Sequence, residues 1–454
     1  MSRSPLTRRE FIRVGSGIAT ASAAINLTML APRLLSAAAR QAAASDTVRF
    51  ASIGTGVRGC ELLQASLRVP GIECVGVCDL YDSRHEAAKE AVKKDVPAPR
   101  DYRTILDRKD VDAIIVATSD HQHRKVVVDA CLAGKDVYCE KPMSHTVEDG
   151  FAIVAATQKA NRILQIGSQG VSSILYGKAR EIYRSGRLGD VFMIEAYSDR
   201  NSASGAWVYP IPPDASEQTI DWNAFLDGAP KRPFDPARFF RWRCFADYGE
   251  GLAGDLFVHL ISGIHFITGT NSPPQRAQST GGIFRWKDGR DFPDLLETFY
   301  DYPAFRVVLR CNLNNDAGGF LAFYGTKGTM TIKGSTLSFK PEDTRPQPKG
   351  YSIYGWPARL REPYLKKWHE DNPLPVPLDF QLDQDVESFT TPHDYDAVAD
   401  HQANFFNAVR TRKPVVENEV FGNHAAIGCH MANYAYFNKA VAVWDQSAKK
   451  IVTA

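Results

Sequence analysis

The sequence predicts an α/β protein with two domains. The first is an N-terminal, doubly wound parallel sheet at 46–168, and the second is a C-terminal α+β domain at 169–454 with an open, mostly antiparallel sheet. Two observations support this. In the first region, short apolar runs alternate with helical patterns, as in parallel sheets with crossover helices. In the second, several apolar runs follow one another without a helix between them, which favours antiparallel pairing.

The expected strands of the first domain are short apolar runs at 48–54, 73–79, 111–119, 136–140 and 163–168. The central run, VDAIIVATS, is continuously apolar in its middle, as expected for a strand that is buried on both faces. Helical patterns lie between these runs. The first ends at Arg68, and the others span 83–94, 124–134 and 146–160. The last of them begins at Thr146 with Asp149 three residues later, which is a capping spacing.

The second domain has expected strands at 190–198, 305–311, 320–325 and 329–334, and expected helices at 396–410 and 424–439. Two stretches, 199–250 and 335–395, look rich in loops. Loops of this length inside a compact domain usually carry function or form an interface.

The first 44 residues have the features of a twin-arginine export signal. Arg8 and Arg9 precede a weakly apolar run of small residues at 14–31, and small-residue cleavage sites follow. A membrane anchor is the alternative, but the run is short and polar for a span. We therefore expect export to the periplasm or the medium, with the twin-arginine export machinery as a partner.

Composition argues against binding to nucleic acid or to an anionic membrane. The chain is 44% hydrophobic and 23% charged, as in soluble globular proteins. Its formal net charge of +2 depends on six arginines in the first 44 residues; the 48 basic and 51 acidic residues that remain give about −3. Eight cysteines are scattered without a C-x-x-C motif, so buried free thiols are expected, with a disulfide as the alternative in an oxidising compartment.

A glycine motif follows the first strand and opens the first helix. Gly54, Gly56 and Gly59 form G-x-G-x-x-G, in which the backbone turns tightly and approaches a pyrophosphate at the helix N-terminus. The motif predicts a Rossmann dinucleotide site that also includes the intervening Thr55, Val57 and Arg58. Asp79 ends the second strand, where a carboxylate bonds the ribose hydroxyls and repels a 2′-phosphate. NAD is therefore the expected cofactor, with NADP as the alternative because Arg84 follows closely.

Polar residues end the next two strands of the parallel sheet. Thr118, His121 and His123 follow the buried strand, and Glu140-Lys141-Pro142 closes the one after it. The carboxyl ends of parallel strands face the ligand crevice, so these side chains are expected to line it. For His123, a capping or packing role is an equal alternative. The proline restricts the backbone of Lys141 and so gives the lysine a defined direction.

Asp255 and His259 lie four residues apart in a helical pattern and are expected to share a face. A carboxylate that orients an imidazole, beside an ammonium group, suits oxidation of an alcohol. His265 falls on another face and is expected to pack. No third ligand stands at a suitable spacing, so no metal site is predicted.

Together these motifs resemble the glucose–fructose oxidoreductase / inositol dehydrogenase family, Gfo/Idh/MocA. The resemblance extends over about residues 46–442, and its most specific part is E-K-P at 140–142 combined with D-x-x-x-H at 255–259. The segments 221–236 and 325–334 further resemble an exported, sugar-directed branch. Ser119 departs from the family, in which proline is common at that position.

The resemblance implies NAD(P)-dependent oxidation of a hydroxyl on a sugar, glycoside or cyclitol. It implies that Lys141 polarises the hydroxyl, that His259 exchanges its proton, and that Asp255 orients the histidine or the substrate. Because free NAD is scarce outside the cytoplasm, we expect a tightly bound, recycled cofactor. The family also implies a homo-oligomer. Aromatic and basic residues of the long loop are candidate substrate contacts, namely Arg200, Trp207, Tyr209 and Trp242, together with Trp222, Arg241 and Arg243.

Two other functions stay open at this stage. One is NAD-dependent glycoside hydrolysis or epimerisation on the same scaffold, through oxidation, elimination and reduction. The resemblance implies that such hydrolases lack the E-K-P lysine, so Lys141 favours the dehydrogenase. The other is a non-catalytic periplasmic sugar-binding protein.

Overall fold

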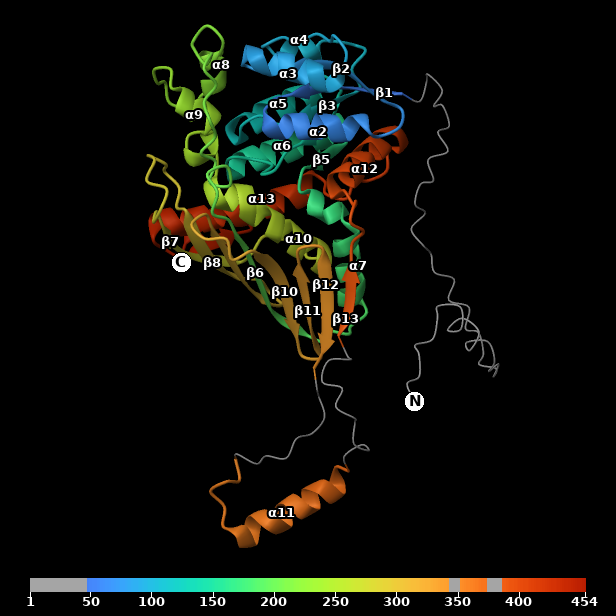
Figure 1. Ribbon diagram of the computed structural model, residues 1–454, viewed down its shortest axis with the longest axis vertical. Helices are drawn as coiled ribbons and strands as arrows, with labels where there is room; N and C mark the ends of the chain where they lie inside the picture. Colours follow the sequence, from blue (N-terminus) through green and yellow to red (C-terminus); the bar gives the residue numbers. More distant parts are fainter. Residues whose placement is uncertain (1–46, 343–351, 374–385) are drawn as a thin grey trace, which may run out of the picture. The chain divides into compact units, whose positions relative to one another are not determined.

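A computed structural model describes residues 47–342, 352–373 and 386–454. The predicted export signal at 1–44 lies outside these residues, as do parts of the stretch 335–395. Figure 1 shows the course of the chain and the labels of its elements.

The first domain is built on a five-stranded sheet with the order β2-β1-β3-β4-β5, in which every pairing is parallel. Its strands are β1 (Val48–Ile53), β2 (Ile72–Cys78), β3 (Ala113–Val116), β4 (Asp136–Cys139) and β5 (Leu164–Ile166). The helices between them are α2 (Val57–Leu67), α3 (Asp82–Val92), α4 (Arg103–Leu106), α5 (Asp120–Leu132) and α6 (Val147–Ala160). The predicted doubly wound sheet is confirmed.

The strand order places a topological switch between β1 and β3. The chain leaves β1 toward β2 on one side and returns to β3 on the other, so the loops after β1 and β3 diverge at the carboxyl edge of the sheet. Such a divergence is where open α/β sheets bind ligands. Two hydrogen bonds hold the loops at this edge, from the Gly54 N–H to the Cys78 carbonyl and from the Ala117 N–H to the Ile53 carbonyl, each 2.8 Å long.

The second domain is built on a ten-stranded sheet with the order β13-β12-β11-β10-β6-β9-β8-β7-β14-β15. All its pairings are antiparallel except that of β6 with β9, which confirms the mostly antiparallel sheet. Its strands are β6 (Val191–Asp199), β7 (Arg276–Gly282), β8 (Leu295–Asp301), β9 (Arg306–Asn312), β10 (Gly319–Gly325), β11 (Gly328–Lys333), β12 (Thr336–Pro341), β13 (Glu387–Thr390), β14 (Ala442–Asp445) and β15 (Lys450–Thr453).

Helices cover one face of this sheet and connect it to the first domain. They are η2 (Gln169–Ser172), α7 (Ile174–Arg184), the π-helical turn η4 (Ala253–Phe257), α10 (Val258–Thr268) and α13 (Glu419–Asn438). The long helix α13 contacts β7 of the large sheet, α10 beside it, and α6 of the first domain. Most of its side chains are accordingly buried.

The chain returns to the first domain near its C-terminal end. Helix α12 (Ala397–Thr411) packs on α2 and β1, and its Phe405 and Phe406 join the buried cluster that contains Phe50 and Leu62. The core of the nucleotide-binding domain thus includes residues from beyond the predicted boundary at 168. Nothing in the local pattern of 396–410 indicated which domain that helix would cover.

The two stretches expected to be loops contain short elements. The first holds α8 (Trp222–Leu226), α9 (Pro236–Phe240) and η3 (Trp242–Cys244), and the described part of the second holds β12, α11 (Ala358–Asp371) and β13. All eight cysteines are free, and all except Cys60 are buried. Within the part of the chain that the structure describes, no helix has both the length and the apolar character needed to cross a membrane.

Candidate active site

A cavity of about 590 Å³ opens at the carboxyl edge of the parallel sheet. The loops after β1, β2, β3 and β4 form one wall, and residues of 200–243, η4 and α10 form the opposite wall. Most of the predicted site residues line it: Gly54, Gly56, Val57, Arg58, Gly59, Asp79, Thr118, Glu140, Lys141, Arg200, Trp207, Tyr209, Trp242, Asp255 and His259. Thr55, His121 and His123 do not.

The glycine loop is shaped for close approach of backbone to ligand. Gly54 has φ +84°, and a Cβ there would lie 2.6 Å from the carbonyl carbon of Ala117, so a larger residue fits neither the backbone nor the space. Gly59 would place a Cβ 2.0 Å from the Gly54 oxygen, so its lack of a side chain lets α2 begin directly against the loop. No side chain caps the N-terminus of α2. The arrangement fits a pyrophosphate on the free N–H groups of that helix.

Asp79 is held by the same loop. One of its carboxylate oxygens accepts hydrogen bonds from the backbone N–H of Thr55, at 2.7 Å, and the other accepts from the N–H of Tyr81, at 3.0 Å. Thr55 itself is buried and turned toward Asp79, so it acts through that carboxylate rather than by lining the cavity. Asp79 lines the cavity next to the glycines. Its position fits recognition of a ribose.

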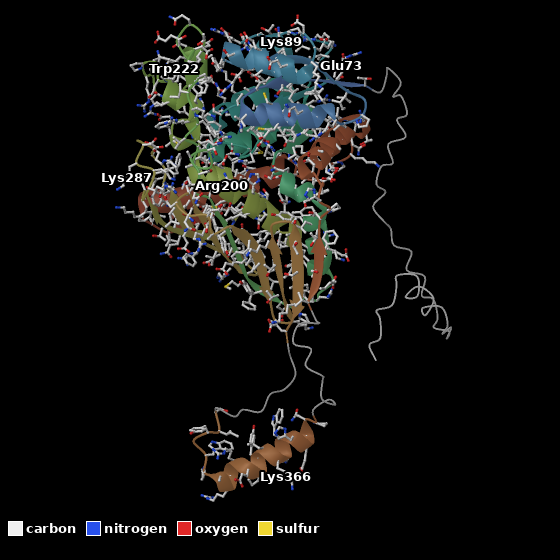
Figure 2. All side chains as sticks on the ribbon, in the orientation of Figure 1. Glu73, Lys89, Arg200, Trp222, Lys287 and Lys366 are labelled. Carbon is white, nitrogen blue, oxygen red and sulfur yellow. The ribbon has the colours of Figure 1, made fainter. Side chains whose placement is uncertain are left out.

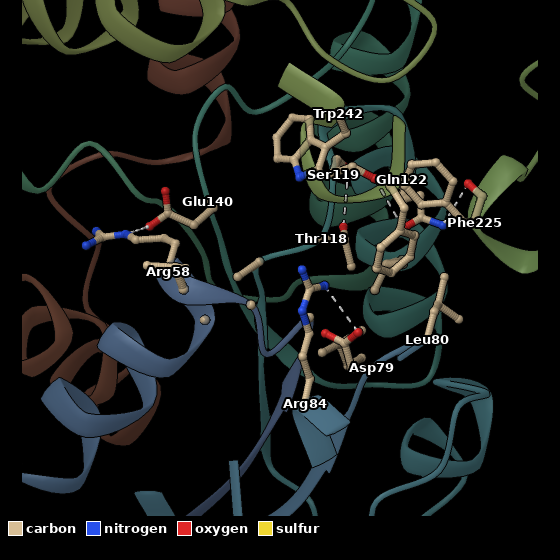
Figure 3. A pocket seen from close by; sticks show the side chains of 18 of the residues that line it. Arg58, Asp79, Leu80, Arg84, Thr118, Ser119, Gln122, Glu140, Phe225 and Trp242 are labelled. Atoms are coloured by element: carbon tan, nitrogen blue, oxygen red, sulfur yellow. Dashed lines mark hydrogen bonds and ion pairs between the residues drawn. The ribbon is translucent and has the colours of Figure 1, made fainter. Parts of the chain in front are cut away.

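Arg84 lies beside this carboxylate, as Figure 3 shows. Its Nη1 is 3.3 Å from Asp79 Oδ1, and its guanidinium stacks over the rings of Tyr81, Phe239 and Phe240. The arginine is therefore fixed by aromatic contacts from both domains. It reduces the net negative charge at the position that discriminates NAD from NADP.

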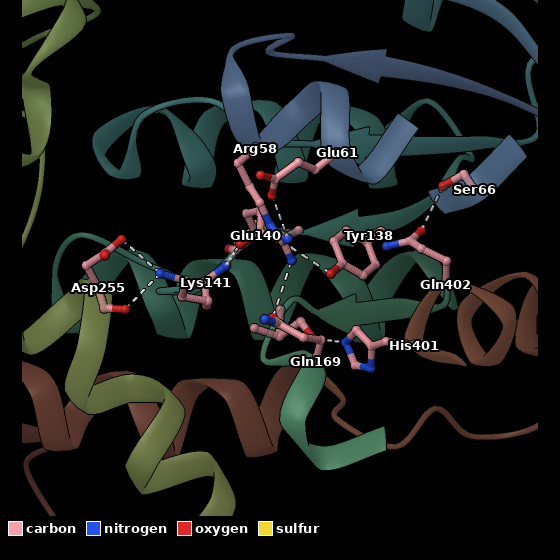
Figure 4. Close-up of polar contacts among 12 residues, drawn as sticks. Arg58, Glu61, Ser66, Tyr138, Glu140, Lys141, Gln169, Asp255, His401 and Gln402 are labelled. Atoms are coloured by element: carbon pink, nitrogen blue, oxygen red, sulfur yellow. Dashed lines mark hydrogen bonds and ion pairs between the residues drawn. The ribbon is translucent and has the colours of Figure 1, made fainter. Parts of the chain in front are cut away.

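Glu140 forms a buried ion pair with Arg58 across the cavity wall (Figures 3 and 4). Arg58 Nε lies 2.9 Å from Glu140 Oε1, and the same guanidinium contacts Glu61 and the side-chain oxygen of Gln169. The other oxygen of Glu140 accepts from the N–H of Lys141 at 3.3 Å. The pair therefore links the helix of the glycine motif to the loop that carries the lysine.

The two histidines after β3 form hydrogen bonds with backbone carbonyls and do not line the cavity. A ring nitrogen of His121 lies 2.8 Å from the Phe225 carbonyl, and one of His123 lies 2.8 Å from the Pro142 carbonyl. Burial lowers the pKa of each to about 4, so both rings are neutral near pH 7 and each donates through one N–H. The expectation that they line the crevice is wrong. His123 instead fixes the loop that presents Lys141, which is the alternative foreseen for it.

Lys141 and Asp255 both line the cavity and contact each other, as Figure 4 shows. Its ammonium group donates to Asp255 Oδ1 at 2.9 Å and to the Asp255 backbone carbonyl at 2.8 Å. An ammonium group has three N–H donors, so one remains for a ligand. Burial favours the neutral acid of Asp255, but the charges of Lys141 and Arg243 outweigh it and hold the pKa of that carboxyl well below its usual range.

Two further residues complete the contacts of Asp255. Arg243 Nε lies 2.9 Å from Oδ1, and the indole N–H of Trp207 donates to Oδ2 at 3.2 Å. On the sequence alone, both residues are candidate substrate contacts. Trp207 is 2% exposed and has φ +60°, a strained backbone for a bulky residue of the kind found at functional sites. These contacts make Asp255 an anchor for Lys141 rather than for His259, with which no hydrogen bond is formed.

His259 faces the cavity from the first turn of α10. Asp255 lies in the π-helical turn η4, so the four-residue spacing between the two residues spans a widened turn, and both still reach the cavity. Among the described residues, no group hydrogen-bonds the His259 ring. Burial, and next the charge of Lys141, lower the pKa of this imidazole well below its usual value. A neutral, unpartnered imidazole beside an ammonium group can accept a proton from a hydroxyl.

The remaining aromatic candidates divide into two groups. Tyr209 and Trp242 line the cavity, and Trp242 stacks on the guanidinium of Arg243 at 4.2 Å. Trp222 instead stacks on Phe225 in the core and donates to a backbone carbonyl, so it only packs. Within the described residues, no group of three or more His, Cys, Asp or Glu side chains could hold a metal ion.

Comparison with known sequences places the first domain. Residues 48–168 match the model of the Gfo/Idh/MocA oxidoreductase family, described as having an NAD-binding Rossmann fold. The first domain is an NAD(P)-binding Rossmann domain that is similar to those of the Gfo/Idh/MocA family. Its glycine loop, Asp79 and the E-K-P lysine are the features that border the cavity.

Curated relatives of this domain have two different activities. Inositol 2-dehydrogenase of Salmonella typhimurium is 32% identical over 150 residues, which cover 33% of this chain and 45% of the relative. Alpha-N-acetylgalactosaminidase of Shewanella oneidensis is 25% identical over 230 residues, covering 44% of this chain and 49% of the relative. The chain thus spans about half the length of the curated relatives it matches.

Solved structures resemble the chain over both domains. An oxidoreductase domain protein from Kribbella flavida has a TM-score of 0.63 at 18% identity and covers 87% of this chain and 98% of its own. A levoglucosan dehydrogenase in complex with NADH and levoglucosan has a TM-score of 0.61 at 14% identity, with coverages of 87% and 98%. Aldose–aldose oxidoreductase from Caulobacter crescentus has a TM-score of 0.61 at 16% identity, with coverages of 87% and 99%. These similarities establish the fold.

Proposed function

We propose that the protein is an NAD-dependent oxidoreductase that oxidises a hydroxyl group of a sugar, glycoside or cyclitol. The observation that carries the proposal is the meeting of three groups at the dinucleotide cavity: Lys141 at the end of β4, Asp255 in η4 and His259 in α10. Inositol 2-dehydrogenase relatives and a sugar-dehydrogenase structural neighbour add support.

Each residue has a defined part in the reaction. Lys141, held by Asp255, donates its third N–H to the oxygen of the reacting hydroxyl and stabilises the negative charge that develops there. His259 takes the proton of that hydroxyl. NAD held by the glycine loop and Asp79 would supply the acceptor for the hydride that leaves the same carbon, and the product would be a carbonyl compound. Arg243 and Trp207 keep Asp255 in place and therefore keep the ammonium group aimed.

The test mixes the NAD-loaded enzyme with a panel of sugars and cyclitols and follows NADH absorbance at the bound nucleotide in a single turnover. The wild type is expected to reduce NAD with at least one of them, and His259→Asn to lose most of that rate while still binding NAD. His424→Asn is the matched control because His424 contacts Asn271 outside the cavity. Equal rates in the wild type and in His259→Asn would remove the histidine from the mechanism.

We further propose export through the twin-arginine route, with a tightly bound cofactor that is recycled. Arg8 and Arg9 and the small-residue run behind them support export. Natively purified protein is then expected to release nicotinamide dinucleotide on denaturation, as identified by mass spectrometry. A nucleotide-free preparation that exchanges added NAD freely would contradict the recycling, and a protein retained in the cytoplasm would contradict the export.

We carry one second candidate, an NAD-dependent glycoside hydrolase, because the galactosaminidase of Shewanella oneidensis is among the relatives. In this case oxidation of a ring hydroxyl would acidify the neighbouring C–H, and loss of that proton would eliminate the aglycone. Water would then add to the double bond that remains, and the hydride held on the cofactor would reduce the carbonyl again. Release of nitrophenol from nitrophenyl glycosides without net NADH formation would favour this function. Net NADH formation from free sugars would favour the dehydrogenase.

We also propose a homo-oligomer that pairs the open face of the large sheet with a second copy. Phe299 is 52% exposed on β8. Farther across the sheet, Tyr197 of β6 meets Phe320 of β10 edge to face. Light scattering of the purified protein is expected to give a multiple of the monomer mass. Phe299→Glu is expected to lower that mass if the face is the interface.

A further inference from the structure

Among the residues that the structure describes, Arg200 is a cation without a partner in the active cavity. It follows β6, where Figure 2 labels it, and its backbone N–H donates to the Asn312 carbonyl at 2.8 Å. Its side chain packs along Gly205 and ends in the cavity lining, partly buried. No described residue forms an ion pair or a hydrogen bond with its guanidinium.

Every other lysine or arginine that lines the cavity has a carboxylate as partner. The pairs are Arg58 with Glu140, Arg84 with Asp79, Arg100 with Asp82, Arg103 with Asp101, Lys125 with Asp227, and both Lys141 and Arg243 with Asp255. A guanidinium group remains charged throughout the physiological range and is costly to bury without a counter-charge. Arg200 is therefore the one cation among these described residues that lacks a counter-charge, and a negatively charged ligand would supply it.

The charges at the substrate end of the cavity do not balance. Lys141, Arg243 and Arg200 bring three positive charges, and Asp255 is the carboxylate that pairs with Lys141 and Arg243. Its Oδ1 already accepts from Lys141 and Arg243, and its Oδ2 accepts from an indole. Asp120 is also buried near Lys141 and Arg243, but burial raises its pKa well above the usual value and favours its neutral form. Arg200 lines the same cavity as His259, and its charge, after burial and the charges of Lys141 and Arg58, lowers the pKa of that imidazole. A bound nicotinamide cation would increase the excess of positive charge further.

We propose that the substrate carries a carboxylate and that Arg200 binds it, so that the enzyme acts on a sugar acid such as a hexuronate. This inference rests on the proposed oxidation and names its substrate class. A single guanidinium presents two parallel N–H groups that match one carboxylate in a bidentate pair. Trp242 and Arg243, which stack on each other and line the same cavity, provide a surface for the sugar ring.

The test compares matched pairs of hexoses and hexuronates, glucose with glucuronate and galactose with galacturonate, together with glucose 6-phosphate. With NAD present, the wild type is expected to have a higher kcat/KM for a uronate than for its neutral partner, and added salt is expected to reduce that preference. Arg200→Gln is expected to lower the uronate-to-hexose ratio about 10- to 100-fold, mainly through KM. Arg200→Lys is expected to retain part of the ratio.

Arg276→Gln serves as the matched control, since Arg276 is an exposed residue of β7 outside the cavity. Preference for neutral hexoses in the wild type, or an unchanged ratio in Arg200→Gln, would overturn the inference. Preference for the phosphate that is lost in Arg200→Gln would overturn the carboxylate assignment. If NAD is never reduced, the proposed oxidation fails and uronate binding is measured by calorimetry instead. Binding that depends on Arg200 would then support the inference about the carboxylate, and absence of such binding would overturn that inference.

Discussion

Replacing Lys141 with methionine tests the positive charge that it brings to the cavity. Methionine has a similar length and removes the ammonium group that contacts Asp255 at 2.9 Å and that has one N–H left for substrate. Loss of one donor to a developing oxyanion costs about 2.7–4 kcal/mol, or about 10²–10³ in kcat. We therefore expect Lys141→Met to lower kcat by that factor while NAD binding is retained, because the glycine loop and Asp79 do not depend on the lysine.

Folding must be separated from chemistry in this variant. Removing one partner of a buried ion pair can cost about 3–5 kcal/mol of stability, but Asp255 keeps Arg243 and Trp207, so the loss is expected to be smaller. Single-turnover NADH formation and urea unfolding should be measured on the same samples. Lys178→Met is the control, since it removes an ion pair with Glu181 on α7, outside the cavity, worth about 0–1 kcal/mol. A folded Lys141→Met enzyme with unchanged kcat would refute the role of the ammonium group.

Three other perturbations test separate parts of the account. Asp79→Asn is expected to shift the NAD-to-NADP affinity ratio toward NADP, measured by fluorescence titration, because a carboxylate repels the 2′-phosphate; an unchanged ratio would assign the choice to other groups. Gly54→Ala is expected to abolish nucleotide binding, because Gly54 has φ +84° and a Cβ there would lie only 2.6 Å from the Ala117 carbonyl carbon. In Gly177→Ala, the control in α7, the new Cβ meets nothing within 4 Å and should be tolerated. Burial lowers the pKa of His401 to about 4 in the folded protein, below its unfolded value near 6.5. As the pH falls, the unfolded chain therefore binds the proton before the folded one does. The free energy of unfolding, measured in urea, should then fall from pH 6.5 toward pH 4.

Periodic patterns explain why the fold could be predicted. Continuous apolar runs with helices between them indicate a parallel sheet, and the strand at 113–116 is fully buried as expected. The strand at 136–139 is also fully buried. The position of α12 could not be predicted in the same way. Phe405 and Phe406 indicate only that one face of that helix is apolar, and contacts with Phe50 link residues more than 300 positions apart.

The site shows a similar division. The ends of strands place Lys141 and Asp79 at the crevice by rule, because carboxyl edges of parallel strands face the ligand. For His121 the same rule failed, because its ring nitrogen found the Phe225 carbonyl in the second domain. The contact of Arg243 with Asp255 joins η3 to η4 and has no signature in sequence spacing. Neither has the π-helical turn at Asp255.

The most direct test of the central claim follows the hydride itself. The purified enzyme would be incubated with NAD and with sugars, sugar acids or cyclitols that carry deuterium on carbon, and the recovered nucleotide would be analysed by mass spectrometry. The account predicts deuterium in the NADH formed by the wild type and little or none in that formed by Lys141→Met. Bound NAD that never acquires deuterium from any of these compounds would contradict the claim that this cavity oxidises an alcohol.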